Sequence, residues 1–177
     1  GMIPDAVVLG STQRIDTNLR LLARTGPNGE RTVMHFGGDF MMGRRYLDPA
    51  GESPALVTEE ASAEAVVSYI APLFGLADMV SVNYESVAGT LSPDDAYAGK
   101  RFLLQSPPET MAALDALGVD VATLGNNHIN DWLGAGVTST IRNLEAAGIA
   151  HPGGGSTEAE ALEPAIVDTS ALSIGVV

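Results

Sequence analysis

Two kinds of hydrophobic pattern alternate along this chain. Short, continuously apolar runs are typical of buried strands, whereas apolar residues that recur every three or four positions are typical of one face of a helix. The predicted strands are residues 19–24, 31–36, 78–82, 119–124, a short run before His151, 166–167 and 174–177. The predicted helices are residues 62–76, 107–117, 137–147 and 157–162.

Turn and capping residues support several of these boundaries. Gly26-Pro27-Asn28-Gly29 separates the first two strands and predicts an antiparallel hairpin. Ser106-Pro107-Pro108-Glu109 has the sequence of a capping box, which predicts the start of the helix 107–117. Gly118 and Gly148 follow two predicted helices and favour the left-handed conformation in which helices commonly end.

Two further expectations concern which segments are buried. The polar residues, glycine and proline of segment 86–100 predict a surface loop. The helix 62–76 has one apolar face, which predicts its contact with the core. The residues of that face are Ala65, Val66, Tyr69, Ile70 and Leu73.

The order of the elements predicts an α/β fold. From residue 31 onward, strands and helices alternate, which favours right-handed crossovers and a largely parallel sheet covered by helices. In such sheets, ligands bind beyond the carboxyl ends of the strands. We therefore expect functional residues in the loops that directly follow the strands.

Composition narrows the function classes. A chain of 177 residues, 45% of them hydrophobic, is long enough for one compact domain. The absence of cysteine excludes disulfides, a thiolate zinc site and a cysteine nucleophile. A net charge of -13 disfavours nucleic acid and favours cations. No apolar run reaches the roughly 18 residues that a membrane-spanning helix needs.

Polar residues follow three of the predicted strands and are expected to converge at one edge of the sheet. They are Asp39; Asn83 and Glu85; and Asn126, Asn127 and His128, with Asp131 shortly after. Carboxylate, amide and imidazole groups bind divalent ions such as manganese, iron and zinc. In a site with two metal ions, a bound hydroxide attacks phosphorus, and a neighbouring histidine can protonate the leaving group.

Each of these residues also has an ordinary structural explanation. Asp39 can cap a helix or close an Asx turn, and Glu85 can be a solvated loop residue. The asparagines tolerate left-handed backbone, and a single His128 is more often structural than catalytic. The turn at 151–155, with three consecutive glycines, resembles a phosphate-binding loop but matches no established phosphate motif.

The order of several motifs resembles the CapA family of poly-gamma-glutamate capsule-synthesis proteins, from about residue 33 to the last residue. These motifs are Gly38-Asp39-Phe40-Met41-Met42-Gly43-Arg44, Val82-Asn83-Tyr84-Glu85, Gly125-Asn126-Asn127-His128-Ile129-Asn130-Asp131, residues 136–140 and residues 147–151. The resemblance implies the calcineurin-like metallophosphatase superfamily, whose fold is a four-layer α/β/β/α sandwich. It divides the chain into an N-terminal extension with the first hairpin strand, residues 1–31, and the N-terminal portion of a CapA domain, residues 32–177.

The resemblance also implies roles for individual residues. Asp39, Glu85 and Asn127 correspond to metal ligands, His128 to the acid that protonates the leaving group, and Asp131 to the residue that orients this histidine. The implied cofactors are divalent Mn, Fe or Zn ions, two in a complete centre. The implied reaction is phosphoester hydrolysis, or a step in making or releasing polyglutamate at the cell envelope.

Two departures from the superfamily pattern favour a different interpretation. Met41 stands where the first motif has a ligand histidine, and no Gly-His-x-His segment follows before Val177. The apolar run 173–177 has the pattern of a core strand cut off in mid-fold. A half-built site without metal would favour a non-catalytic scaffold in a polymer-synthesising envelope complex, and an uncovered sheet face would favour a homo-oligomer.

Overall fold

A computed structural model describes residues 32–43 and 59–177 of the chain. Its main sheet has three parallel strands in the order β1-β2-β5. These strands are β1 (Met34–Phe40), β2 (Met79–Tyr84) and β5 (Val121–Thr123). Ala150 extends this sheet through a parallel bridge to Val121. The predicted α/β class with a parallel sheet is therefore confirmed.

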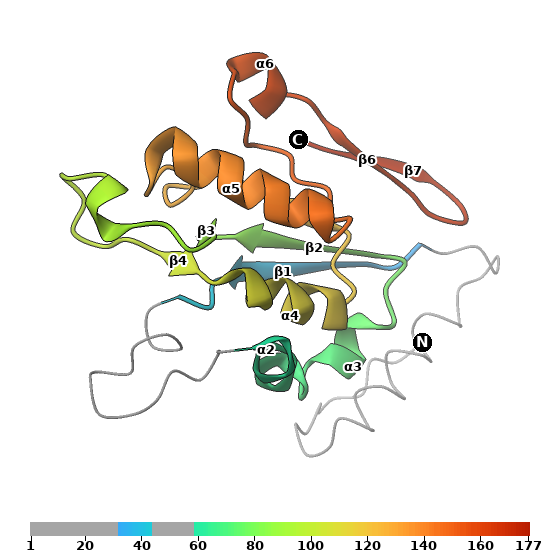
Figure 1. Ribbon diagram of the computed structural model, residues 1–177. Coiled ribbons are helices and arrows are strands. Elements are labelled where there is room, and N and C mark those ends of the chain that lie inside the picture. The colour runs from blue at the N-terminus through green and yellow to red at the C-terminus, as the bar shows by residue number, and fades with distance from the viewer. Residues whose placement is uncertain (1–31, 44–58) are drawn as a thin grey trace.

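Helices follow the strands of the main sheet, as the alternating pattern predicted. The helices are α2 (Glu60–Val67), α3 (Ala71–Phe74), α4 (Met111–Ala116), α5 (Leu133–Ala146) and α6 (Glu158–Ala161), with short 3-10 turns at Pro93–Asp95 and Pro108–Thr110. In Figure 1, α4 lies between α2 and α5 beside the strands, and residues of all three helices line one shallow hollow. No helix in the described part is both long and apolar enough to cross a membrane.

The hydrophobic core lies between the main sheet and the helices α2, α4 and α5. Val80 and Val82 of β2 and Ala122 of β5 contribute from the sheet. The helices contribute Ala63, Leu114 and Leu144, all of which are fully buried. The core therefore holds the three parallel strands in place and fixes the position of their carboxyl ends.

Two small sheets complete the fold. Strands β3 (Val87–Ala88) and β4 (Gln105–Ser106) pair in parallel, and β6 (Ala165–Asp168) pairs with β7 (Ser173–Val176) in an antiparallel hairpin. The predicted strand near the last residue is confirmed as β7, and none of its residues is buried. The first strand of the predicted hairpin, 19–24, lies outside the described residues.

The predicted helix 62–76 is wrong in its continuity and in its buried face. Helix α2 ends at Val67 and α3 begins at Ala71. The reason is Pro72, which lacks an amide donor and whose ring would clash with the preceding turn of a continuous helix. Ala63 and Val67 face the core, whereas Tyr69 is 83% exposed.

The predictions for segment 86–109 are also partly wrong. Ser86 is fully buried and β3 follows it, so the start of this segment is not a surface loop. The predicted capping box does not form, because Ser106 belongs to β4. Its hydroxyl accepts the amide of Met42 at 3.3 Å and donates to the hydroxyl of Ser86 at 2.9 Å.

Other predicted boundaries are confirmed. Gly118 has φ 65° and Gly148 has φ 72°, as expected for glycines that end helices. Thr157 caps α6 by accepting the amide of Glu160. Helix α5 begins at Leu133, earlier than the predicted position 137.

Candidate metal and acid–base site

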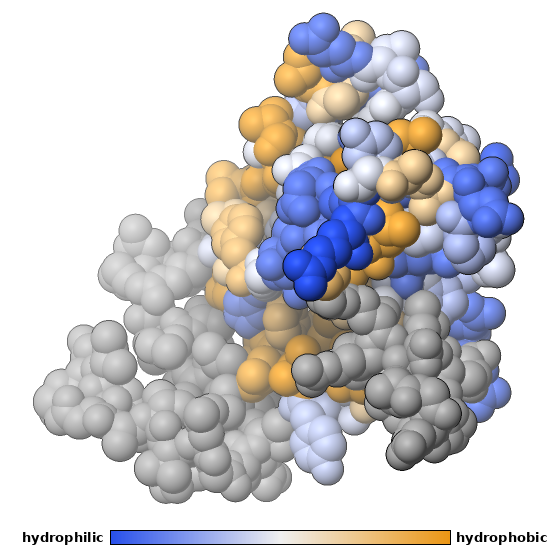
Figure 2. Space-filling view, turned by 90° about the vertical axis from the view of Figure 1, so that its left-hand side faces the viewer, coloured by the Kyte–Doolittle hydropathy of each residue, from blue (hydrophilic) through white to orange (hydrophobic). Residues whose placement is uncertain are grey.

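Three strand ends bring the predicted polar residues to one edge of the main sheet. In the parallel register, Asp39 pairs with Asn83, and Asn83 pairs with Thr123. The register between β1 and β2 shifts between Phe36 and Asp39, and such an irregularity re-aims the side chains that follow it. Figure 2 views the molecule from the side toward which β1 and β2 run, and on this face hydrophilic and hydrophobic residues lie side by side.

Asn83 connects the two acidic residues of the site. Its side-chain amide donates to Oδ1 of Asp39 at 2.8 Å and to Oε2 of Glu85 at 3.4 Å. The two carboxylates are 46 positions apart in the sequence (residues 39 and 85), but they are neighbours in space. The structure thus brings together two of the three predicted metal ligands.

Asn126 ties the loop after β5 to the same network. Its amide nitrogen donates to Oδ1 of Asn83 at 3.0 Å and to the carbonyl of Tyr84 at 2.9 Å. Its Oδ1 accepts the backbone amides of His128 at 2.9 Å and Ile129 at 3.1 Å. Asn126 therefore uses its whole side chain to fix the backbone that carries His128.

The carboxyl groups of Asp39 and Glu85 shift each other's pKa in opposite directions. Hydrogen bonds from Asn83 and then Glu85 lower the pKa of Asp39. The hydrogen bond with Asp39 raises the pKa of Glu85, and burial and the charge of Asp39 add to this effect. Two adjacent carboxyl groups of this kind favour a shared proton or a bound cation, because either relieves the repulsion between them.

His128 lies between Glu85 and Asp131. Its Nδ1 is 2.8 Å from Oδ2 of Asp131, whose side chain is fully buried. Its Nε2 lies 3.9 Å from Oε1 of Glu85, which is too far for a hydrogen bond. Asp131 also accepts the amide of Leu104 at 2.6 Å. The arrangement holds the imidazole ring with Nε2 toward the carboxylate pair.

The structure places Asn127 differently from its neighbours. Residue Asn127 is exposed, and its backbone carbonyl accepts a hydrogen bond from Lys100. The amide side chain that reaches the carboxylate network is that of Asn126. The role of Asn127 as a metal ligand stays a prediction.

Sequence reasoning missed Asn126 as a connector and Lys100 altogether. The ammonium group of Lys100 also donates to Oδ1 of Asp131 and lies 3.3 Å from Nδ1 of His128. Lys100 belongs to the segment that was predicted to be a surface loop, so no pattern linked it to the strand ends. The one feature of the sequence that could have pointed to Lys100 is that basic residues are few in this strongly acidic chain.

The chemistry of the donors suits a divalent cation only in part. Asp39 and Glu85 offer oxygen ligands, and His128 offers a ring nitrogen. Within residues 32–43 and 59–177, however, no group of three or more His, Cys, Asp or Glu side chains has the arrangement to hold a metal ion. The described residues therefore provide a pair of carboxylates rather than a complete ligand set.

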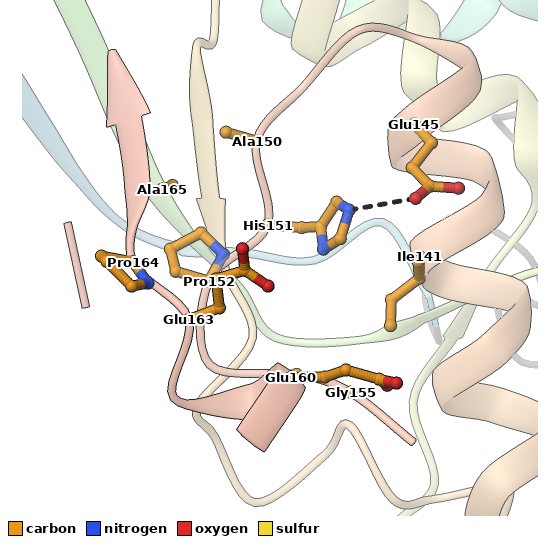
Figure 3. A pocket seen from close by; sticks show the side chains of 11 residues that line it. Ile141, Glu145, Ala150, His151, Pro152, Gly155, Glu160, Glu163, Pro164 and Ala165 are labelled. Carbon is orange, nitrogen blue, oxygen red and sulfur yellow. Dashed lines mark ion pairs between the residues drawn. The ribbon is translucent and has the colours of Figure 1, made fainter. Parts of the chain in front are cut away.

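A second hollow lies between α5 and the segment that contains α6. Figure 3 shows His151 pointing toward Glu145 of α5, and the atoms Nε2 and Oε1 of these residues are 3.7 Å apart. Glu160 and Glu163 also line this cavity of about 380 Å³. Three carboxylates around the hollow disfavour a phosphorylated ligand at the neighbouring glycine turn, because like charges repel.

Close packing explains the glycines of that turn. A Cβ atom on Gly153 would lie 2.6 Å from the amide nitrogen of Gly125, and one on Gly154 would lie 2.7 Å from Cδ1 of Leu124. The amide of Leu124 donates to the carbonyl of Pro152 at 2.8 Å. The turn therefore supports the backbone that leads directly into Asn126.

Comparisons with known proteins found related sequences. The sequence model of the family described as bacterial capsule synthesis protein PGA_cap matches residues 33–177. The PGA biosynthesis protein CapA of Bacillus subtilis (strain 168) is 30% identical over 121 residues, which are 66% of this chain and 30% of that protein. The capsule biosynthesis protein CapA of Bacillus anthracis is 28% identical over 128 residues, which are 71% of this chain and 29% of that protein. The matched segments thus span less than a third of either relative.

Proposed function

Because this chain belongs to the bacterial capsule synthesis protein family PGA_cap, we propose that it takes part in poly-gamma-glutamate capsule synthesis through a cation-dependent hydrolytic site. One relative is named PGA biosynthesis protein CapA and the other capsule biosynthesis protein CapA, and these names support a role in the synthesis of this polymer. The observation that carries the hydrolytic site is the contact of Asp39 and Glu85 through Asn83, with Nε2 of His128 3.9 Å from Glu85.

The proposed roles of Asp39, Glu85 and His128 rest on the geometry of the site, whereas that of Asn127 rests on the family resemblance. Asp39 and Glu85 would hold a divalent Mn, Fe or Zn ion, together with an amide oxygen from Asn127. Such an ion supplies a Lewis acid and an activated water when it is bound. Asp131 holds Nδ1 of His128, which leaves Nε2 to carry a proton to a leaving group. Substrates of this site would be phosphoesters or a bond of the polymer.

We propose that the main sheet is one half of a four-layer α/β/β/α sandwich. His35 contacts the ring of Phe74 in α3, so His35 faces the helices. Met34 and Phe36 alternate with His35 and face the other way, and they are 41% and 68% exposed. A second sheet packed on this face would cover both side chains.

Metal binding and hydrolysis by matched variants test the proposed site. We expect wild type to bind Mn²⁺ in calorimetry and to hydrolyse bis-(p-nitrophenyl) phosphate in the presence of Mn²⁺. Asp39→Asn and Glu85→Gln should weaken Mn²⁺ binding by at least about tenfold, since each removes one carboxylate charge from the ion. His128→Ala should keep Mn²⁺ binding and lower the hydrolysis rate by about 100-fold or more.

A charge-matched control separates the site from overall acidity. Glu64 is exposed on α2, so Glu64→Gln removes the same charge as Glu85→Gln without touching the carboxylate pair. We expect Glu64→Gln to behave as wild type in both assays. Equal Mn²⁺ binding by wild type, Asp39→Asn and Glu85→Gln would refute the proposed site.

A second candidate function is a non-catalytic subunit of an envelope complex that synthesises the polymer. Met41 in the position of a ligand histidine and the absence of a three-ligand cluster among the described residues favour it. In that case Mn²⁺ binding and hydrolysis would both be absent from wild type. The purified chain would instead bind poly-gamma-glutamate or synthase subunits in a pull-down that Glu64→Gln does not affect.

A further inference from the structure

The loop between β3 and β4 docks on the loop that carries His128. The amide of Tyr97 donates to the carbonyl of Asp131 at 2.8 Å, and the indole of Trp132 donates to the carbonyl of Ser92 at 2.8 Å. The amide of Leu104 reaches Oδ2 of Asp131 from the far end of the same loop. These contacts place Lys100, near the middle of the loop, against Asp131.

The ammonium group of Lys100 has three neighbours in the site. It donates to the carbonyl of Asn127 and to Oδ1 of Asp131, and its Nζ lies 3.3 Å from Nδ1 of His128. The side chain of Asp131 is fully buried, whereas that of Lys100 is 24% exposed. A buried carboxylate requires a partner of opposite charge, and Lys100 provides it.

The two neighbours of His128 Nδ1 have opposite requirements. An ammonium group can only donate a hydrogen bond, and a carboxylate can only accept one, so a single ring nitrogen satisfies one of them. Asp131 is the nearer neighbour, at 2.8 Å against 3.3 Å for Lys100. The donors of Lys100 are directed to Oδ1 of Asp131 and to Asn127, which leaves Oδ2 as the acceptor for Nδ1–H.

We infer that Lys100 is a positioning residue, which fixes the carboxylate of Asp131 so that His128 donates from Nδ1 and presents Nε2 toward Glu85. The hydrogen bond itself does not depend on the proposed function, whereas the consequence for hydrolysis rests on it. Without Lys100, Oδ1 of Asp131 loses the ammonium group that binds it, and the carboxylate keeps only part of its orienting contacts, those of Oδ2 with the amide of Leu104 and the ring of His128.

Proton NMR of the imidazole groups tests this inference in the 177-residue protein. A ring N–H that donates to a buried carboxylate is protected from exchange with water and gives a resolved downfield resonance. We expect this resonance in wild type, and its absence in His128→Gln assigns it. Lys100→Met should abolish it or broaden it beyond detection. Retention of the resonance at its wild-type position in folded Lys100→Met would overturn the inference.

Arg101→Met is the matched control. It removes one positive charge from the neighbouring position, where the guanidinium lies 5.1 Å from the ring centroid of Phe102. We expect Arg101→Met to keep the downfield resonance. The conservative variant Lys100→Arg should retain the downfield resonance at least in part, because a guanidinium group also donates to carboxylates. Equal loss in Arg101→Met and Lys100→Met would mean that overall charge controls the signal, contrary to the inference.

If Lys100→Met is too unstable for the NMR measurement, thermal unfolding of single and double variants tests the same interaction. We expect Lys100→Met to lower the Tm of wild type by about 5 °C or more. In the Asp131→Asn background, the same change should lower the Tm by less than half as much, because the buried charge is gone. An equal loss of Tm in both backgrounds would overturn the inference.

The outcome is separable from that of the proposed function. A wild-type protein that neither binds Mn²⁺ nor hydrolyses the phosphodiester would refute the proposed function and leave the NMR comparison intact. If hydrolysis is present, Lys100→Met should lower kcat about tenfold or more with little change in KM, since His128 acts after substrate is bound. An unchanged kcat in folded Lys100→Met would contradict the positioning role.

Discussion

Asp39 and Glu85 influence each other because their carboxyl groups interact directly, through a hydrogen bond and through charge. The pKa of Glu85 is raised from its ordinary value of 4.5, mainly by Asp39, so ionisation of Glu85 opposes folding at higher pH. The pKa shift of Asp39 has the opposite sign. Its pKa is lowered in the folded protein, so the ionised carboxylate stabilises the fold, and this stability is lost as the pH falls through the folded-state pKa. Neither group is deeply buried, and solvent weakens both effects.

The first prediction uses the sign of the Glu85 shift. Glu85→Gln removes a charge that the folded protein disfavours, because the pKa of Glu85 is raised on folding, so the Tm of the variant should gain on that of wild type as the pH rises from about 4 to about 7. Thermal unfolding in a metal-free buffer measures both differences. A variant whose Tm falls relative to that of wild type over this pH range would contradict the repulsion described here.

The site residues that lie near the ends of predicted strands could be predicted from the sequence. Asp39 lies at the carboxyl end of β1, Glu85 directly follows β2, and His128 lies in the loop after β5, so the parallel register brings them together. Lys100 was missed because it reaches Asp131 from a long loop, through contacts that no periodic pattern encodes. The choice between Asn126 and Asn127 also depends on which way the loop turns after β5, and sequence does not specify this.

At the scale of elements, the order of strands and helices followed from the hydrophobic pattern, whereas several boundaries did not. The break between α2 and α3 could have been predicted from Pro72 alone. The buried start of segment 86–100 could not, because β3 is only two residues long and is held by contacts with α5. Short strands of this kind depend on tertiary packing more than on local propensity.

The second prediction concerns that contact between β3 and α5. Thr140 is fully buried, and its hydroxyl accepts the amide of Ala88 at 2.9 Å. Thr140→Val should destabilise the protein by about 1–3 kcal/mol in urea denaturation, because the amide loses its acceptor. Thr140 also donates to the carbonyl four residues earlier, and Thr138 makes the equivalent hydrogen bond to Gly134. Thr138 is exposed and has no bond to Ala88 among the described contacts, so Thr138→Val should cost less than about 0.5 kcal/mol. Equal costs would argue against a specific role for the Ala88 bond.

The third prediction concerns the glycine turn behind the site. Gly153 has φ 87°, and a Cβ atom there would approach the amide nitrogen of Gly125 to 2.6 Å. Gly153→Ala should therefore cost about 2–4 kcal/mol in free energy of unfolding. Gly118 has φ 65° with open space around it, so Gly118→Ala should cost only about 1–2 kcal/mol. If the two variants lost the same stability, close packing on Gly125 would not constrain the turn.

At the scale of the whole molecule, one face of the sheet carries helices and one edge carries the polar site. The fold class was predictable because alternation of strands and helices leaves few topologies for a parallel sheet. A net charge of -13 attracts cations to the whole surface. Binding of Mn²⁺ alone therefore does not identify the site, and the position of the bound ion has to be measured. The proposed function depends on a cation site formed by Asp39 and Glu85, with His128 beside it.

Anomalous X-ray diffraction from crystals soaked in Mn²⁺ would locate the cation relative to Asp39 and Glu85. The account predicts a manganese peak within about 2.0–2.6 Å of a carboxylate oxygen of both Asp39 and Glu85, and its disappearance in Asp39→Asn. Manganese bound only at other acidic positions, with Asp39 and Glu85 bare, would contradict the account.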